Sequence, residues 1–193
     1  MALILTDIDD TVLTWYREFA KWLFTAKGIK APTSEETWAL GERLGISEDH
    51  ADQLVNEFNA SGEFFDLKPC RKSEIYLPML AVDHKVIGIT SGSSNLMDIE
   101  TTKALRAANI ERYLPNVFSD LIVLPLHGDK KPYLEQYYPS YWVEDSLSNA
   151  VKGLEAGHVV YLMDVPHNKT QNSDLRKVRD WSDIYDDIQN YQN

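Results

Sequence analysis

The chain has 193 residues, of which 44% are hydrophobic and 11% aromatic, and its formal net charge is −11. This composition predicts a folded domain, and the negative charge argues against binding to a nucleic-acid polymer or an anionic membrane. With Cys70 as its single cysteine, the chain forms no internal disulfide. No apolar stretch approaches the roughly 20 residues of a membrane span, and the first residues lack the segments of a secretion signal. We therefore expect a cytoplasmic protein.

The first predicted element is a short buried strand at residues 3–6. Apolar side chains at helical spacing then predict a helix over residues 15–26. Residues 33–36 read Thr-Ser-Glu-Glu, a capping-box pattern that predicts a helix ending at Gly45. Ser47 is a suitable cap for another helix reaching about Asn59.

Strands and helices alternate in the rest of the chain. Four short apolar runs predict strands at residues 86–89, 121–124, 141–143 and 158–163. Helices are predicted from Ser93 or Ser94 to about Ala108, from Ser146 to Ala156, and from Asp180 to Ile188. This alternation is typical of an α/β fold with a parallel sheet and right-handed crossovers.

About 80 residues separate the first strand from the second, far more than one crossover helix needs. We interpret residues 14–66 as a helical insert that leaves the carboxyl edge of the sheet. The prediction is a core of residues 1–13 and 67–193 around a five-stranded parallel sheet, with the insert as a small second unit.

Polar side chains follow four of the predicted strands. They are Asp7, Asp9 and Asp10 after the first strand, Thr90 and Ser91 after the second, Lys131 after the third, and Glu144 and Asp145 after the fourth. Because ligands bind at the carboxyl ends of parallel strands, we expect these groups to meet at one edge of the sheet.

Several carboxylates at one place need a counter-charge. Two carboxylates about 4 Å apart repel by roughly 4 kcal/mol at an effective dielectric constant near 20. Asp7, Asp9 and Asp145 are therefore stable together only with a proton or a cation among them. Oxygen ligands without nearby His or Cys favour Mg²⁺ over zinc. An aspartate, a second acid, a metal, a lysine and a hydroxyl together indicate phosphoryl transfer.

Four motifs, in order along nearly the whole chain, resemble those of the haloacid dehalogenase (HAD) superfamily of phosphohydrolases. They are LILTDIDDTVL at 3–13, VIGITS at 86–91, DKKP at 129–132 and YWVEDSLSNAVKGLEAGHVVYLM at 141–163. The resemblance implies a three-layer Rossmann-like core with a C1 cap, here residues 14–66. Two positions depart from the family pattern, Asp10 where a glycine is usual and Asn149 where a second acid is usual.

The resemblance also implies catalytic and metal-binding roles. Asp7 would be the nucleophile that forms an aspartyl-phosphate, and Asp9 would protonate the leaving alcohol and then activate water. Asp7, the backbone carbonyl of Asp9, and Asp145 would hold Mg²⁺, with Glu144 in or beside that shell. Dehalogenases of the superfamily lack the acid at Asp9, so we expect a phosphatase.

Phosphate binding would fall to Thr90, Ser91 and a lysine. Lys130 and Lys131 compete for the lysine position, and the proline after Lys131 favours Lys131.

Trp15, eight residues after Asp7, would enter the cap near the reacting phosphate. The last strand and its Pro- and Asn-containing loop resemble the deoxyribonucleotidase branch, in which an aromatic at this position stacks on the base. We expect a small phosphorylated metabolite as substrate, and a nucleoside 5′-monophosphate, deoxy or pyrimidine type, as its identity. Sugar phosphates or phosphoglycolate are the alternative.

Each assignment has a structural alternative. Asp7 and Asp9 are also compatible with a turn and a helix cap, and Trp15 with plain packing among the apolar residues of its helix. A catalytically silent binding module with the same fold is the alternative from another functional class.

Overall fold

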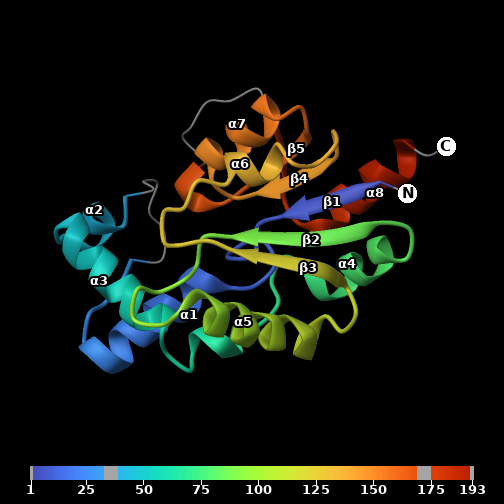
Figure 1. The fold of residues 1–193 in the computed structure, drawn as a ribbon. Coiled ribbons are helices and arrows are strands. Elements are labelled where there is room, and N and C mark those ends of the chain that lie inside the picture. The colour runs from blue at the N-terminus through green and yellow to red at the C-terminus, as the bar shows by residue number, and fades with distance from the viewer. Residues whose placement is uncertain (1, 33–38, 169–174, 192–193) are drawn as a thin grey trace.

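The computed structural model describes residues 2–32, 39–168 and 175–191. Its centre is a parallel sheet of six strands in the order β3-β2-β1-β4-β5-β6 (Figure 1). The strands are β1 (Leu3–Thr6), β2 (Lys85–Thr90), β3 (Phe118–Val123), β4 (Tyr141–Glu144), β5 (Val159–Met163) and β6 (Arg176–Val178). The five predicted strands are present. The predicted count of five is wrong, because β6 is a three-residue edge strand with two basic residues and no apolar run.

The helices cover both faces of this sheet. They are α1 (Trp15–Trp22), α2 (Leu40–Leu44), α3 (Glu48–Asn59), α4 (Ser73–Ala81), α5 (Ile99–Tyr113), α6 (Lys131–Leu134), α7 (Leu147–Glu155) and α8 (Trp181–Tyr191). A π-helical turn at Leu23–Lys27 continues α1, and single 3-10 turns occupy Phe64–Asp66 and Pro166–Asn168. Within the described ranges, no helix has the length and hydrophobicity that a membrane span requires.

Alternate side chains of each strand face opposite layers. Ile4 and Val86 belong to the core cluster that also contains residues of α4, α5 and α8, whereas Leu5, Ile87 and Trp142 belong to the cluster with α6 and α7. Figure 1 shows α6 and α7 on one side of the sheet and α4 and α5 on the other. The molecule therefore has the three layers expected of an α/β fold.

The helix after β2 begins later than predicted. Asp98 caps α5 by accepting a hydrogen bond from the Thr101 N–H at 2.8 Å. The hydroxyl of Ser94 instead donates to the Asn56 carbonyl at 2.7 Å, which ties the loop after β2 to α3. The predicted cap at Ser93 or Ser94 is therefore wrong, because Ser94 makes a tertiary contact.

Helices α1, α2 and α3 lie at the end of the sheet where β1, β2 and β3 finish (Figure 1). Ser47 caps α3 as predicted, accepting from the His50 N–H at 3.3 Å. The predicted capping box at residues 33–36 lies outside the described residues. Buried aromatic side chains, Phe19 and Phe58 among them, join these helices to the core beneath the sheet. This packing places α1 and α3 beside the carboxyl ends of β1, β2 and β3.

Candidate active site

The turn after β1 places three aspartates in three different environments. The Asp7 N–H donates to the Val143 carbonyl at 2.9 Å, which continues the pairing of β1 with β4. Asp10 has a left-handed backbone (φ 55°), and its carboxylate accepts hydrogen bonds from the N–H groups of Trp15 and Tyr16 at 2.9–3.0 Å. Asp10 therefore caps the start of α1, which explains an aspartate where a glycine is usual in the resembled family.

Asp7, Glu144 and Asp145 form a buried carboxylate cluster. One oxygen from each lies within 4.8 Å of the others. Burial raises the pKa of Asp7 to about 8 and the pKa values of Glu144 and Asp145 to about 7. Because a bound cation would offset this loss of hydration, and carboxylate oxygens are the donors that Mg²⁺ prefers, these residues fit a magnesium ion.

Lys130 provides one positive charge for this cluster. Its Nζ lies 2.6 Å from Asp7 Oδ1 and 2.9 Å from Glu144 Oε2, and its side chain is 3% exposed. Glu144 Oε1 accepts the N–H groups of Asp145 and Ser146 at 3.0 and 3.1 Å. Both oxygens of Glu144 are thus engaged, which leaves Asp7 and Asp145 as the carboxylates with the greater freedom to bind a metal.

The prediction that Lys131, and not Lys130, is the phosphate-binding lysine is wrong. Lys131 does not belong to the cavity lining, and its Nζ pairs with Glu155 on the surface at 2.7 Å. Lys130 lies just before the first residue of α6, so the two neighbouring side chains leave the backbone in different directions. The lysine beside the carboxylates is therefore Lys130.

Asp9 is held by two groups that are distant in sequence. Arg106 Nη2 on α5 lies 2.5 Å from Asp9 Oδ1, and the Thr90 hydroxyl donates to Asp9 Oδ2 at 3.1 Å. The side chain of Arg106 is 1% exposed, and its guanidinium lies 4.3 Å from the centre of the Phe64 ring. Both carboxylate oxygens of Asp9 thus have partners outside the cluster, and the role of its backbone carbonyl as a metal ligand stays a prediction.

The loop after β5 supports Asp145. His167 Nε2 lies 3.3 Å from Asp145 Oδ2, and the Asn168 side-chain amide donates to the Asp145 carbonyl at 2.8 Å. Burial lowers the pKa of His167 to about 4, so its ring is neutral near neutral pH. His167 and Asn168 were not among the predicted site residues because the histidines show no ligand spacing in the sequence, although both residues closely follow the last predicted strand.

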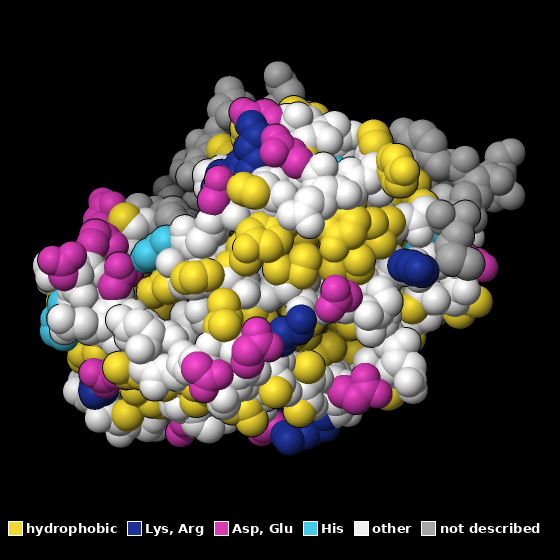
Figure 2. Space-filling view, in the orientation of Figure 1, with side chains coloured by type: hydrophobic (Ala, Val, Ile, Leu, Met, Phe, Trp, Pro, Cys, Tyr) yellow, Lys and Arg dark blue, Asp and Glu magenta, His cyan; other side chains and the backbone are white. Residues whose placement is uncertain are grey.

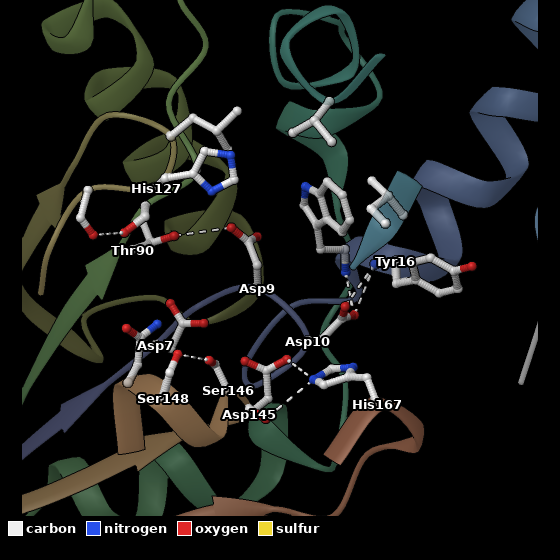
Figure 3. A pocket seen from close by; sticks show the side chains of 18 of the residues that line it. Asp7, Asp9, Asp10, Tyr16, Thr90, His127, Asp145, Ser146, Ser148 and His167 are labelled. Atoms are coloured by element: carbon white, nitrogen blue, oxygen red, sulfur yellow. Dashed lines mark hydrogen bonds and ion pairs between the residues drawn. The ribbon is translucent and has the colours of Figure 1, made fainter. Parts of the chain in front are cut away.

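A cavity of about 580 Å³ unites these residues (Figure 3). The predicted residues in its lining are Asp7, Asp9, Trp15, Thr90, Ser91, Glu144 and Asp145. Figure 3 shows Asp7 and Asp9, from the turn after β1, and Asp145, from the end of β4, around one space. The convergence predicted from the strand ends is therefore present, with Lys130 in place of Lys131.

The side chains of Trp15 and Ser91, two predicted site residues, make contacts with other residues of the protein. One face of the indole stacks on Phe19 at 4.8 Å between ring centres, and its Nε1 donates to Asn59 Oδ1 at 3.0 Å. Asn59 in turn donates to the Gly92 carbonyl at 3.0 Å, which links α3 to the loop after β2. The Ser91 hydroxyl donates to the Gly128 carbonyl at 3.1 Å, so this hydroxyl already has a partner.

Comparison with known proteins identifies the fold. No protein-family model matches the chain, and no curated protein matches it in sequence. Among solved structures, it is similar to a haloacid dehalogenase-like hydrolase from Streptococcus pneumoniae, with a TM-score of 0.67, 10% identity, and 97% and 98% of the two chains covered.

Two further structures are similar over the full length. The HAD-hydrolase YfnB from Bacillus subtilis, bound to magnesium, gives a TM-score of 0.62 at 15% identity, with 97% and 98% of the chains covered. A D,D-heptose 1,7-bisphosphate phosphatase from B. bronchiseptica, complexed with magnesium and phosphate, gives 0.56 at 13% identity, with 99% of each chain covered. The chain therefore has the fold of HAD-like hydrolases.

Proposed function

We propose that the protein is a Mg²⁺-dependent phosphomonoester hydrolase. The observation that supports this most directly is the buried cluster of Asp7, Glu144, Asp145 and Lys130 at the wall of the large cavity. Two similar structures are described as bound to magnesium, one of them together with phosphate.

The nucleophile in this proposal is Asp7. A carboxylate oxygen of Asp7 attacks phosphorus, the bond to the ester oxygen breaks, and the leaving alcohol takes a proton from Asp9. The ionised Asp9 then accepts a proton from a water molecule, which attacks the aspartyl-phosphate. This second step releases inorganic phosphate and restores the carboxylate of Asp7.

The remaining polar groups would hold the phosphoryl oxygens. The Nζ of Lys130 donates toward Asp7, and the Thr90 hydroxyl lies beside Asp9, so both are close to the reacting groups. Asp7, Asp145 and the backbone carbonyl of Asp9 would hold Mg²⁺, with Glu144 beside them. When bound, the metal would neutralise negative charge on the phosphoryl group.

For the substrate we propose a nucleoside 5′-monophosphate. A cavity of about 580 Å³ is in the range of small-molecule sites, and Trp15 lies in its lining. Stacking of a base on an aromatic ring contributes about 1–3 kcal/mol. Because Phe19 covers one face of the indole, a base would use the other face or the edge.

Sugar phosphates are the second candidate, which the similarity to the heptose bisphosphate phosphatase favours. A panel of nucleoside monophosphates, sugar phosphates and phosphoglycolate, with p-nitrophenyl phosphate as a general substrate, distinguishes the two. We expect turnover that needs Mg²⁺ and the highest kcat/KM for a nucleotide. Faster hydrolysis of sugar phosphates would replace the nucleotidase proposal, and no turnover of any compound would favour a binding module.

A Trp15→Leu variant tests the stacking role. We expect about a tenfold or larger rise in KM for nucleotides, which is the loss of one stacking contact, and little change for p-nitrophenyl phosphate. Equal effects on both compounds would show that Trp15 only supports the packing of α1.

A further inference from the structure

A second cavity, of about 220 Å³, adjoins the first and is lined by arginines from three segments. They are Arg17 on α1, Arg43 on α2 and Arg71 just before α4. Asp10 is the only carboxylate among the described residues of this lining, and its oxygens accept backbone N–H groups. In a chain with a net charge of −11, this small cavity is locally positive.

Hydrogen bonds hold the Arg71 guanidinium in place, but they engage only its Nε and Nη1 groups. Its Nε donates to the Asp10 carbonyl at 3.1 Å, and its Nη1 donates to the carbonyls of Asp164 and Arg179 at 3.3 and 3.0 Å. Among the described residues, Nη2 has no hydrogen-bond acceptor. Two N–H groups of an already oriented guanidinium are therefore available to a ligand.

Arg43 has still more unused donors. Its guanidinium lies over the Tyr16 ring at 3.8 Å from the centre, and its buried Nε has no hydrogen-bond partner. No carboxylate of the described residues forms an ion pair with it. Because Nε is closed to solvent, an anionic oxygen in the cavity would contact the Nη groups, for which the described residues provide no acceptor.

The third arginine is more exposed. The Nε of Arg17 pairs with Glu18 at 3.2 Å, its Nη2 lies 3.4 Å from the Thr14 hydroxyl, and its side chain is 67% exposed. We therefore expect Arg17 to contribute less than the other two.

We propose that this second cavity is a phosphate-binding subsite, which holds a distal phosphate of a substrate whose scissile phosphate lies at Asp7. Guanidinium groups bind phosphate oxygens through paired N–H donors. The two cavities share Asp10, Tyr16, Arg43 and His167, so one molecule can reach both. This inference rests on the proposed function and deepens it: the preferred substrate is a 5′-nucleotide that carries a second phosphate, such as a nucleoside 3′,5′-bisphosphate, and the 5′-monophosphate is the weaker substrate.

The first experiment measures binding without turnover. Isothermal titration of the intact protein with inorganic phosphate, in the absence of Mg²⁺, compares wild type with Arg17→Gln and Arg43→Gln. We expect about tenfold weaker binding for Arg43→Gln, the loss of one charged hydrogen-bonding group, and a smaller loss for Arg17→Gln. The matched control is Arg112→Gln, because Arg112 pairs with Asp66 on the surface and lines neither cavity.

Arg17 lines only the second cavity, so its variant separates this subsite from phosphate bound near Asp7. Circular dichroism confirms that each variant is folded, and Arg43→Lys keeps the charge if Arg43→Gln does not fold. Unchanged phosphate affinity in the Arg17 and Arg43 variants would overturn the proposal. Because no turnover is measured, a failure of the phosphatase proposal leaves this result intact.

The second experiment distinguishes a distal phosphate from free phosphate. We compare KM for a nucleoside 3′,5′-bisphosphate and the corresponding 5′-monophosphate. We expect the bisphosphate to have about a tenfold lower KM in wild type and no advantage in Arg43→Gln. Equal KM values in wild type, with phosphate binding still dependent on Arg43, would contradict the distal-phosphate assignment and show that the cavity takes a separate phosphate.

Discussion

The guanidinium of Arg106 lies 2.5 Å from the carboxylate of Asp9, although 97 residues separate them in sequence. The Thr90 hydroxyl engages the other oxygen of the same carboxylate. Arg106 comes from the buried side of α5, where a charged residue is stable only with a partner. We infer that Arg106 positions Asp9 for its proposed work as acid and base.

Replacing Arg106 with Met is therefore expected to lower kcat about tenfold or more, because a misplaced catalytic group loses this much rate. The change also leaves Asp9 without its counter-charge, and breaking such a buried pair costs on the order of 3 kcal/mol of folding free energy. Steady-state kinetics and thermal unfolding measure both effects.

Arg106→Lys separates positioning from general stability, because it keeps the charge but not the planar guanidinium that contacts both Asp9, through Nη2, and the Phe64 carbonyl, through Nη1 at 3.3 Å. We expect it to recover stability more fully than kcat. Arg112→Met on the exposed side of the same helix is the control. If Arg106→Met kept the wild-type kcat at a temperature where it is folded, Arg106 would have no positioning role.

Lys130 and Lys131 offer a matched pair of substitutions one residue apart. Lys130→Met removes the ammonium group that contacts Asp7 and Glu144, so we expect kcat/KM to fall about 100-fold or more, since a charged donor is lost in a buried site. Lys131→Met removes surface pairs with Glu155 and Glu135, and we expect activity within about twofold of wild type. A larger loss of kcat/KM in Lys131→Met than in Lys130→Met would show instead that Lys131 is the phosphate-binding lysine, as the sequence predicted.

The sheet was predictable because its strands are short apolar runs followed by polar residues. Residues such as Ile4 and Leu5 are fully buried on opposite faces of the sheet, which is what an apolar run in a central parallel strand indicates. The carboxyl ends of those strands then determine where Asp7, Thr90 and Asp145 meet. β6 lacks this signal because Arg176 and Lys177 are exposed at the sheet edge.

The parts of the site that the sequence did not predict depend on tertiary contacts. Arg106 reaches Asp9 across the packing of α5, and no local pattern connects the two residues. His167 and Asn168 contact Asp145 through a turn whose conformation has no strong sequence signature. Local sequence patterns therefore predict where the strands end. The residues that contact each acid can be identified only in the folded structure.

Asp7→Asn tests the nucleophile. An amide cannot form the aspartyl-phosphate, so we expect kcat to fall by about 1,000-fold or more, with the far-ultraviolet circular dichroism spectrum unchanged. Asp83→Asn, at an exposed loop position, is the control and keeps full activity. A near-normal rate in Asp7→Asn would remove Asp7 from the mechanism.

Metal binding is measurable without substrate. A cation that binds only the folded protein stabilises it by RT ln(1 + [L]/Kd), about 2.7 kcal/mol at 100 times Kd. We therefore expect Mg²⁺ to raise the melting temperature of wild type, and Asp145→Asn to lose most of this rise because one buried ligand is neutral. An equal rise in Asp145→Asn would place the ion elsewhere.

The carboxylate cluster also predicts how stability depends on pH without metal. Burial raises the pKa of Asp7 to about 8 and those of Asp10, Glu144 and Asp145 to about 7. Because these values exceed those of the unfolded chain, the folded protein binds protons more tightly. The protonated carboxyl groups therefore contribute to the stability of the folded state. This contribution is complete below about pH 4 and is lost as the pH rises through about 7 to 8. His167, whose pKa is lowered to about 4, opposes this trend only below its unfolded value near 6.5.

We therefore expect the melting temperature of the metal-free protein to fall by several degrees between about pH 6 and about pH 8.5. Mg²⁺ favours the ionised carboxylates, so an excess of Mg²⁺ should remove most of this fall. Differential scanning calorimetry with EDTA or with Mg²⁺ at matched ionic strength measures both curves, and Asp145→Asn should flatten the metal-free one. A melting temperature that rose over this range in EDTA would show that the three clustered acids are ionised and already compensated by the protein, which would remove the electrostatic need for a cation.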